Sequence, residues 1–382
     1  MFGNRRNFRQ IEHEKQTMLD PVALARASRE RKRKIARNIL FSVFGVIFAM
    51  VASWTVIRAV GKVNLEKQAQ AAVPVLQTPE TIEAPPEEKQ EWKEGWVKYN
   101  GKIYEYNDDL ITFLFMGIDK SGKVKEVAEG TNGGQADALF LLVLDQYNRE
   151  INIVGINRNT MTDIDIYNEN GDYVDTVKAQ IAVQHGFGNG VEKSCEYQVD
   201  AVRKLLYNIP IHGYAAINMK AIPIINDTVG GVNVEALSDV YDEKDRKIIS
   251  QGEAVHLMGN DAAMYVRDRD TGEFGSADVR LARQKQYLTN FVSQAKAAAK
   301  DDIGVVSELY NQLMPYMTTD VTFDEVAYLA PEVTGYTFET DGFHMIKGET
   351  VMGEEFEEYY VDEEALYDLI IDVFYKEVGL ND

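Results

Sequence analysis

The chain has 382 residues, of which 45% are hydrophobic and 26% charged, so it can form at least one sizeable core and is neither collagen-like nor wholly disordered. Its 61 acidic side chains outnumber 40 basic ones, giving a net charge of -21, which argues against a body that binds nucleic acid through phosphate contacts. The single cysteine, Cys195, excludes an intramolecular disulfide and any multi-cysteine metal site.

Charge and hydropathy change sharply near the N-terminus. Residues 1–37 hold 11 basic and 4 acidic side chains, whereas residues 38–382 hold 29 basic and 57 acidic ones. The twenty residues at 38–57 carry no charge and are long enough, as a helix, to cross roughly 30 Å of hydrocarbon. The positive-inside rule then predicts a cytoplasmic tail at 1–37, a transmembrane helix at 38–60 and an extracellular remainder.

This pattern predicts a single-pass protein of the cell membrane. A cleavable signal peptide is the competing interpretation, but the apolar run is longer than a usual signal core and no convincing small-x-small cleavage site closes it. Residues 61–95 follow, rich in Gln, Glu and Pro, a composition that favours an extended, solvated spacer between the membrane and the folded body.

The folded body begins near Trp96 with two short alternating runs around Asn100-Gly101, the pattern of a type I′ hairpin. Apolar runs at 111–118, 136–145 and 151–157 predict interior strands, and shorter runs at 214–218 and 230–235 predict two more. Helical patterns fall at 195–208, 219–229, 259–267, 276–300, 302–315, 323–330 and 362–377. This alternation predicts an α/β or α+β layered domain at 96–300, with residues 301–382 as a helical and strand extension packed on it.

Arginines are concentrated between residues 265 and 288, in a body that is otherwise acidic. Arg267 and Arg269 project to one side if that segment is extended. The following helix places polar side chains at i, i+3, i+4 and i+7, namely Arg280, Arg283, Gln284 and Tyr287. A guanidinium cluster suits a pyrophosphate, because each planar group donates two bonds without losing its charge. The alternative is a solvated face whose arginines pair with nearby acidic side chains such as Asp268 and Asp278.

Two aspartates lie at the two ends of the loop between the first two predicted interior strands. Asp119 ends one strand and Asp137 lies near the start of the next, after a glycine-containing loop. Carboxylates brought together at strand ends can hold Mg²⁺, which prefers one or two of them plus phosphate oxygens. Ordinary turn carboxylates are the alternative.

Six stretches of the folded body resemble those of a known protein family. The stretches FLFMGID (113–119), GQADALFLLVLD (134–145), INRNT (156–160), GYAAINMKAIPIINDTVGGVNV (213–234), YVRDRD (265–270) and RLARQ (280–284) resemble, in this order, the LytR-CpsA-Psr proteins. The resemblance implies an α/β/α layered domain with a central mixed sheet. It also implies a binding site for a polyprenyl-pyrophosphate lipid, with the tail in an apolar tunnel and the pyrophosphate among arginines at its mouth.

The activity that the resemblance implies is transfer of a lipid-linked glycan phosphate, such as a teichoic acid or capsular polymer, onto peptidoglycan. By position, Asp119 and Asp137 correspond to magnesium-linked acids and Arg158 to the arginine after the third strand. Arg267 and Arg269 match paired pyrophosphate arginines, and Arg280, Arg283 and Gln284 match a closing substrate-binding element. Catalysis would come mainly from positioning and charge neutralisation, with Asp137 accepting the proton of the attacking hydroxyl.

Two positions depart from the family pattern. Gln135 stands where the family usually has Arg, and Asn159 where it usually has Asp. We expect Gln135 to remain among the substrate-binding residues. The same departures motivate an alternative function, a catalytically weakened lipid-binding or scaffold protein of cell-wall assembly, and hydrolysis of the polyprenyl pyrophosphate is a third possibility.

Overall fold

The computed structural model describes residues 51–68, 74, 76, 93, 95–128, 130, 132–242, 244–268 and 274–379. The predicted cytoplasmic tail and most of the predicted membrane span, residues 38–60, lie outside this set. Within the described residues, no helix combines the length and hydropathy that a bilayer span requires. Residues 58–382 form one compact unit, separate from residues 1–57, and the description below concerns that unit.

A six-stranded mixed sheet forms the centre of this unit, in the order β13-β8-β3-β4-β5-β14. β3–β4 and β4–β5 are antiparallel neighbours, whereas β3–β8 and β5–β14 are parallel. The strands are β3 (Leu110–Ile118), β4 (Ala136–Asp145), β5 (Glu150–Ile156), β8 (Gly213–Asn218), β13 (Met317–Thr319) and β14 (Phe343–Met345). The interior strands predicted at 111–118, 136–145, 151–157 and 214–218 are therefore confirmed.

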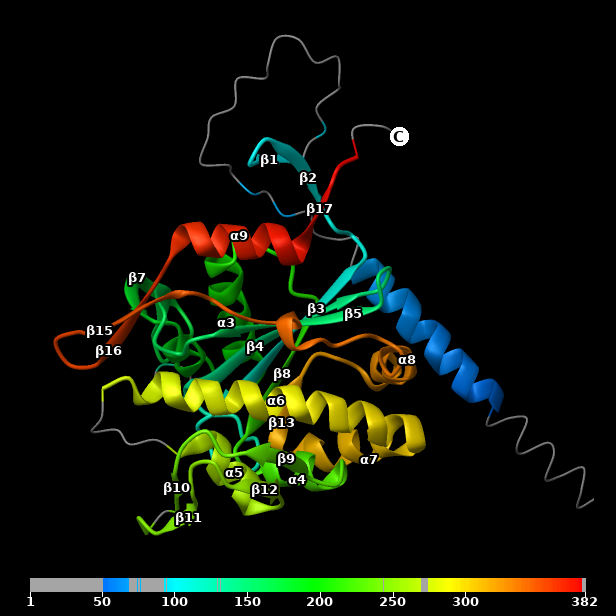
Figure 1. Cartoon of the computed structure of the whole chain (residues 1–382). Helices are drawn as coiled ribbons and strands as arrows, with labels where there is room; N and C mark the ends of the chain where they lie inside the picture. The colour runs from blue at the N-terminus through cyan, green and yellow to red at the C-terminus, as the bar shows by residue number, and fades with distance from the viewer. Residues whose placement is uncertain are drawn as a thin grey trace, which may run out of the picture. The chain divides into compact units, whose positions relative to one another are not determined.

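Helices cover both faces of the sheet (Figure 1). Side chains alternate along most of β4: Leu139 and Leu141 pack in the cluster that includes α3 (Glu192–Leu205) and α9 (Glu363–Phe374). Phe140 and Leu142 pack in the other cluster, with α6 (Ser276–Asp301) and α8 (Phe323–Val333). Burial of apolar side chains on both faces is the main stabilising contribution to such layers. The predicted α/β/α layering around a mixed sheet is confirmed.

A third cluster joins α6 to a smaller subdomain. Tyr265 and Val266 of α5 pack with Val232, Val234 and the α6 side chain Tyr287. This part comprises α4 (Ala221–Thr228), β9 (Val232–Glu235), β10 (Val240–Tyr241), β11 (Lys247–Ile249), β12 (Ala254–Leu257) and α5 (Asn260–Arg267). α6 is thus packed against two cores at once, which fixes the direction of its polar stripe.

The other elements surround these layers. They are β1 (Val97–Tyr99), β2 (Lys102–Tyr106), β6 (Met161–Tyr167), β7 (Tyr173–Gln180), η1 (Ile181–Phe187), α7 (Gly304–Leu313), η2 (Met314–Tyr316), η3 (Thr340–Gly342), β15 (Gly348–Met352), β16 (Glu357–Val361) and β17 (Tyr375–Glu377). β1, β2 and β17 make a three-stranded sheet. Asn100 and Gly101 join β1 to β2 with φ of 48° and 80°, so the type I′ turn is confirmed.

The extended spacer predicted at 61–95 requires correction at its start. Residues 51–68 are helical, and Leu65 is only 1% exposed, packed in the core cluster beside α8. Gly61 and Leu65 lie one turn apart on the same buried face. Packing against the folded body stabilises this helix. The Gln- and Glu-rich composition of the surrounding sequence did not predict that burial. Most of residues 69–95 lie outside the described residues.

Candidate functional site

A β-bulge presents Asp137 to the site. Gly117 pairs with Ala138 and Ile118 pairs with Ala136, so Asp137 is the extra residue on β4 between two normal pairs. Bulges of this kind redirect a side chain and are common next to active sites. The bulge therefore interrupts the alternation of β4 at the residue that the sequence marked as a catalytic candidate.

Two arginines from distant segments converge on the Asp137 carboxylate. Arg158, in the turn after β5, places its Nε 3.2 Å from Oδ1, and Arg280 of α6 places its Nη1 3.7 Å from Oδ2. All three side chains are at most a quarter exposed. The Asp137 carboxylate therefore contacts two guanidinium groups in a partly buried position where screening by water is weak. Guanidinium groups brought together in this way can also bind phosphate oxygens.

Asp119 and Gln135 lie on the same side of this cluster. The Asp119 Oδ1 atom accepts a hydrogen bond from the backbone N–H of Gln135 at 2.8 Å, and the side-chain oxygen of Gln135 accepts one from Arg158 Nη2. Gln135 thus links Asp119 to Arg158. Within the described residues there is no group of three or more acidic, His or Cys side chains arranged to hold a metal, so a magnesium site here would consist of Asp119, Asp137 and ligand oxygens.

Arg283 and Gln284 contact the end of α5. Arg283 is 2% exposed; its Nη2 donates to the backbone oxygen of Asp268, and its Nη1 lies 3.8 Å from the Asp268 carboxylate. Gln284 Nε2 donates to the backbone oxygen of Val266 at 3.0 Å. Burial lowers the pKa of Arg283, while Asp268 and Tyr265 act in the opposite direction. In this structure both side chains position the α5 terminus; their predicted contact with substrate stays a prediction.

Arg267 is held between those two contacts. It is the last residue of α5, in helical rather than extended conformation, and it is half-buried. None of the described carboxylates lies within ion-pair distance of its guanidinium group. Arg269 lies outside the described residues, so the predicted pairing of Arg267 with Arg269 stays a prediction. The contacts of Arg158 and Arg280 with Asp137, by contrast, are seen directly in the structure.

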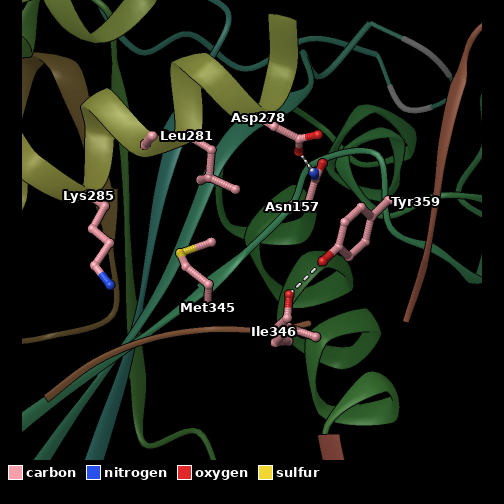
Figure 2. Close-up of a pocket in the computed structure, with 8 residues that line it drawn as sticks. Asn157, Asp278, Leu281, Lys285, Met345, Ile346 and Tyr359 are labelled. Atoms are coloured by element: carbon pink, nitrogen blue, oxygen red, sulfur yellow. Dashed lines mark hydrogen bonds between the residues drawn. The ribbon is translucent and has the colours of Figure 1, made fainter. Parts of the chain in front are cut away.

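A pocket of about 240 Å³ opens beside the arginine cluster. Its lining includes Asn157, next to Arg158 in the chain, and Leu281, next to Arg280. Figure 2 shows Leu281 and Met345 pointing toward each other across it. Asn157 Nδ2 donates to Asp278 at 3.0 Å, and the Tyr359 hydroxyl donates to the Ile346 oxygen at 2.7 Å. The pocket surface is mainly apolar, but its volume is smaller than the roughly 300–1,000 Å³ of typical ligand pockets.

The β15–β16 hairpin contributes side chains that the sequence analysis missed. Glu357 accepts hydrogen bonds from the Gly275 N–H (2.8 Å), just before α6, and from Asn159 Nδ2 (3.4 Å), just after Arg158. Thr350 donates to Asp278 at 3.0 Å, and Tyr359 lines the pocket. The hairpin therefore connects the two segments that carry Arg158 and Arg280. A surplus of Glu in GEEFEEYY (353–360) is the only local signal, and it does not indicate a partner.

His185 supports the loop that precedes β4. Its Nδ1 lies 3.0 Å from the Gly134 oxygen and its Nε2 lies 3.9 Å from Cys195 Sγ, with both side chains fully buried. Burial lowers the pKa of His185 to about 4, whereas bonds to the backbone of Gly134 and Gly133 act in the opposite direction. The ring is therefore neutral near pH 7, with Nδ1–H donating to Gly134.

Comparison with known proteins identifies the family. The LytR_cpsA_psr family model matches residues 75–370, well over half of the chain. The chain belongs to this family. A curated relative is the polyisoprenyl-teichoic acid–peptidoglycan teichoic acid transferase TagU of Bacillus cereus, 27% identical over 219 residues that cover 56% of this chain and 62% of the relative. The chain thus spans about three-fifths of that relative's length.

Solved structures of low sequence identity share the fold. TagV of Bacillus subtilis gives a TM-score of 0.54 at 20% identity, covering 69% of this chain and 96% of that chain. The structure of TagT bound to LI-WTA gives a TM-score of 0.50 at 18% identity, covering 69% of this chain and 89% of that chain. These likenesses support the α/β/α architecture of this LytR_cpsA_psr protein.

The departures from the family pattern have defined places in the structure. Gln135, at a position where the resemblance implies an arginine, is an amide whose oxygen accepts a hydrogen bond from Arg158. Asn159 is 3% exposed and is held by Gln180 at 3.1 Å and by Glu357. Because Asn159 is uncharged, the carboxylate at this turn of the LytR_cpsA_psr domain comes from its hydrogen-bond partner Glu357.

Proposed function

We propose that the protein is a membrane-anchored extracytoplasmic transferase that moves a glycopolymer phosphate from a polyprenyl-pyrophosphate carrier to peptidoglycan. The observation that carries this proposal is the cluster of Arg158, Arg280 and Asp137 beside a mainly apolar pocket. Two neighbouring guanidinium groups suit a diphosphate, and the adjoining pocket suits the first isoprene units of its tail. The polyisoprenyl-teichoic acid transferase activity named for the TagU relative supports the same substrate class.

In the proposed reaction, Arg158 and Arg280 exchange part of their contact with Asp137 for contacts with the diphosphate. A peptidoglycan hydroxyl attacks the glycan-side phosphorus, the bond from that phosphorus to the bridging oxygen breaks, and polyprenyl phosphate leaves. The hydroxyl proton passes to Asp137, which the arginines have by then partly released. Arg267, which has no described acidic partner, would add positive charge near the transferred group.

We also propose that Asp119 and Asp137 hold Mg²⁺ together with diphosphate oxygens. Gln135 bridges Asp119 to Arg158, and Arg158 contacts Asp137, so the two carboxylates belong to one polar cluster. Two carboxylates plus phosphate oxygens are a suitable ligand set for this ion. When bound, Mg²⁺ would neutralise charge on the diphosphate.

The membrane-anchored part of the proposal depends on the uncharged stretch at 38–57 and the basic tail before it. With the N-terminus in the cytoplasm, the LytR_cpsA_psr domain lies outside the cell, where peptidoglycan is assembled.

Replacing Arg267 by Ala tests the function with little expected effect on folding. Loss of a cation that acts on the transferred phosphate should lower turnover of a polyprenyl-pyrophosphate-linked glycan by about 100-fold or more. Arg203→Ala on α3 is the control, since its exposed side chain pairs with Asp200 at 3.5 Å on the helix surface. Equal turnover by wild type and Arg267→Ala, with both proteins folded, would exclude the proposed role of this arginine.

A catalytically weakened lipid-binding protein is the second candidate function. The neutral residues Gln135 and Asn159, both hydrogen-bonded within the protein, favour it. It predicts binding of the polyprenyl-pyrophosphate donor without magnesium-dependent turnover. Restoring charge with Gln135→Arg and Asn159→Asp should then create turnover that the natural chain lacks.

A further inference from the structure

The loop between β3 and β4 brings lysines together in a chain that is otherwise acidic. Residues 120–125 hold three lysines and no acidic residue, and a fourth lysine stands two residues after β8. The four are Lys120, Lys123, Lys125 and Lys220, all of them exposed. None of their ammonium groups forms an ion pair or a hydrogen bond with another described residue. The acidic residue that follows, Glu126, contacts Asn189 at 3.2 Å instead.

Hydrogen bonds hold this loop across the ends of two strands. The Met219 N–H, just after β8, donates to the Lys120 oxygen at 2.9 Å. The Val124 N–H donates to the Pro315 oxygen, just before β13, also at 2.9 Å. Lys220 follows Met219 directly, so it lies close to Lys120 in space. The lysines are therefore carried on backbone that is already positioned, and a ligand would not have to order it.

Lys120 connects the loop to the candidate site. A Cβ atom at Gly134 would lie 2.8 Å from both Asp119 Oδ1 and Lys120 Cε, so the two side chains lie against the same glycine. Asp119 also accepts from the Gln135 N–H, and the Gln135 side chain accepts from Arg158. The lysines thus continue the polar surface that begins at the arginine cluster.

The order of strands places the lysines and the apolar pocket on opposite sides of that cluster. The ends of the six central strands at this edge follow the order β13-β8-β3-β4-β5-β14. Lys120 and Lys220 follow β3 and β8, whereas the pocket residues Asn157 and Met345 lie at the ends of β5 and β14. Asp137 on β4 lies between them. From β8 to β5 the distance is three strand spacings, about 14 Å.

A polyprenyl-pyrophosphate donor has its parts in the same order. The lipid lies on one side of the diphosphate and the glycan on the other, so a lipid in the pocket would direct the glycan toward the lysines. Ammonium groups are compact charges on flexible stems, which suits anionic groups whose positions vary along a polymer. One exposed charge pair contributes little, so such a contact needs several of them. A neutral glycan would gain no charge interaction here.

We propose that Lys120, Lys123, Lys125 and Lys220, hereafter the lysine surface, bind acidic groups in the repeat units of the transferred polymer. The polymer is then polyanionic, with phosphate or carboxylate groups along its length, and not a neutral polysaccharide. This inference deepens, and rests on, the proposed transferase function. Phosphate and carboxylate present the same anionic oxygens to the lysines, and separate probes distinguish them.

Binding of soluble oligomers tests the lysine surface directly. The full chain in a nonionic detergent is titrated with labelled poly(glycerol phosphate), oligogalacturonate and dextran of equal length. The test variant combines Lys123→Gln, Lys125→Gln and Lys220→Gln, and keeps Lys120 because that side chain lies beside Asp119. At about two- to threefold per exposed charge pair, it should bind the preferred anionic oligomer roughly 10-fold more weakly than wild type. The oligomer that wild type prefers identifies the acidic group.

The control variant changes the charge equally at exposed lysines elsewhere, namely Lys67→Gln, Lys244→Gln and Lys300→Gln. It should bind like wild type, and dextran should bind to none of the proteins. Equal affinities of the two triple variants for both anionic oligomers, or no binding of either oligomer by wild type, would overturn the proposal. The difference should disappear at 1 M salt, where the Debye length is about 3 Å. A difference that persists would contradict a charge contact.

Inorganic pyrophosphate separates the lysine surface from the diphosphate site. It should raise the melting temperature of wild type and of the test variant equally, because Arg158 and Arg280 are intact in both. A smaller rise in the test variant would place these lysines in the diphosphate site, and so would contradict a separate contact with the polymer.

Turnover separates this inference from the proposed function. Two donors are compared on the same polyprenyl pyrophosphate, one with a polyanionic polymer and one with a neutral disaccharide. The test variant should have a KM about 10-fold higher for the first donor with kcat little changed, and should turn over the second within twofold of wild type. If wild type turns over neither donor, the transferase proposal fails while the oligomer titration still decides the lysine surface. Equal losses on both donors would contradict a polymer contact.

Discussion

The Asp137 carboxylate contacts two cationic side chains of the candidate site. Its place in a β-bulge directs the carboxylate toward Arg158 and Arg280, so one side chain restrains two cations that come from different parts of the chain. A diphosphate must compete with Asp137 for these arginines. This competition would keep the arginines in position before the donor arrives.

Asp137→Asn should remove the carboxylate that Arg158 and Arg280 both contact. We expect it to lower the free energy of unfolding by roughly 1–3 kcal/mol, because a favourable charge interaction in a partly buried position is lost. Inorganic pyrophosphate should then raise the melting temperature of the variant more than that of wild type. Asp163→Asn, at an exposed pair with Lys178, is the control. An equal response of variant and wild type to pyrophosphate would show that the arginines do not share an anion site.

His185 should make stability depend on pH below neutrality. Burial lowers its pKa to about 4 from an ordinary 6.5, so between these values the unfolded chain binds a proton that the folded ring excludes. Stability is therefore unaffected by this group above pH 6.5 and falls as the pH drops toward 4, by roughly 3 kcal/mol in total. His185→Gln, which can still donate to Gly134, should show a shallower fall in that window. Identical pH profiles from thermal unfolding would contradict this assignment.

At the scale of elements, the β15–β16 hairpin connects the two segments that supply arginines to Asp137. Glu357 accepts from Gly275 before α6 and from Asn159 after Arg158, so it is a positioning residue. Its carboxylate also lies at the N-terminus of α6, where negative charge is stabilised. The hairpin belongs to the segment that the sequence analysis treated as a packed extension, yet it borders the site.

Glu357→Gln should retain one acceptor and lose the charge. We expect kcat for the glycan donor to fall about 10-fold with KM little changed, because the arginines would still bind the diphosphate but in a less favourable geometry. Glu357→Asp should restore part of the loss. Glu354→Gln, at an exposed position of the same hairpin, is the control. A loss of thermal stability alone, with kcat unchanged, would show that Glu357 has only a structural role.

At the scale of the molecule, long apolar runs made the sheet predictable, because burial on both faces leaves few polar residues in β3, β4 and β5. The spacing of Arg280, Arg283 and Gln284 predicted one polar stripe of α6, and the structure shows that Arg280 and Arg283 are buried. Their separate contacts could not be predicted, since these depend on where α5 ends and on the bulge at Asp137. The packed helix at 58–68 was missed because its burial depends on α8, far along the chain.

The central claim is most directly tested by identifying the product. The full chain in nanodiscs is incubated with Mg²⁺, a polyprenyl-pyrophosphate-linked glycan and peptidoglycan fragments, and the products are analysed by mass spectrometry. The account predicts a fragment that has gained the glycan phosphate, with polyprenyl phosphate released, and about 100-fold less of both with Arg267→Ala. Recovery of free glycan phosphate without modified peptidoglycan, or of unchanged donor that remains bound, would contradict it.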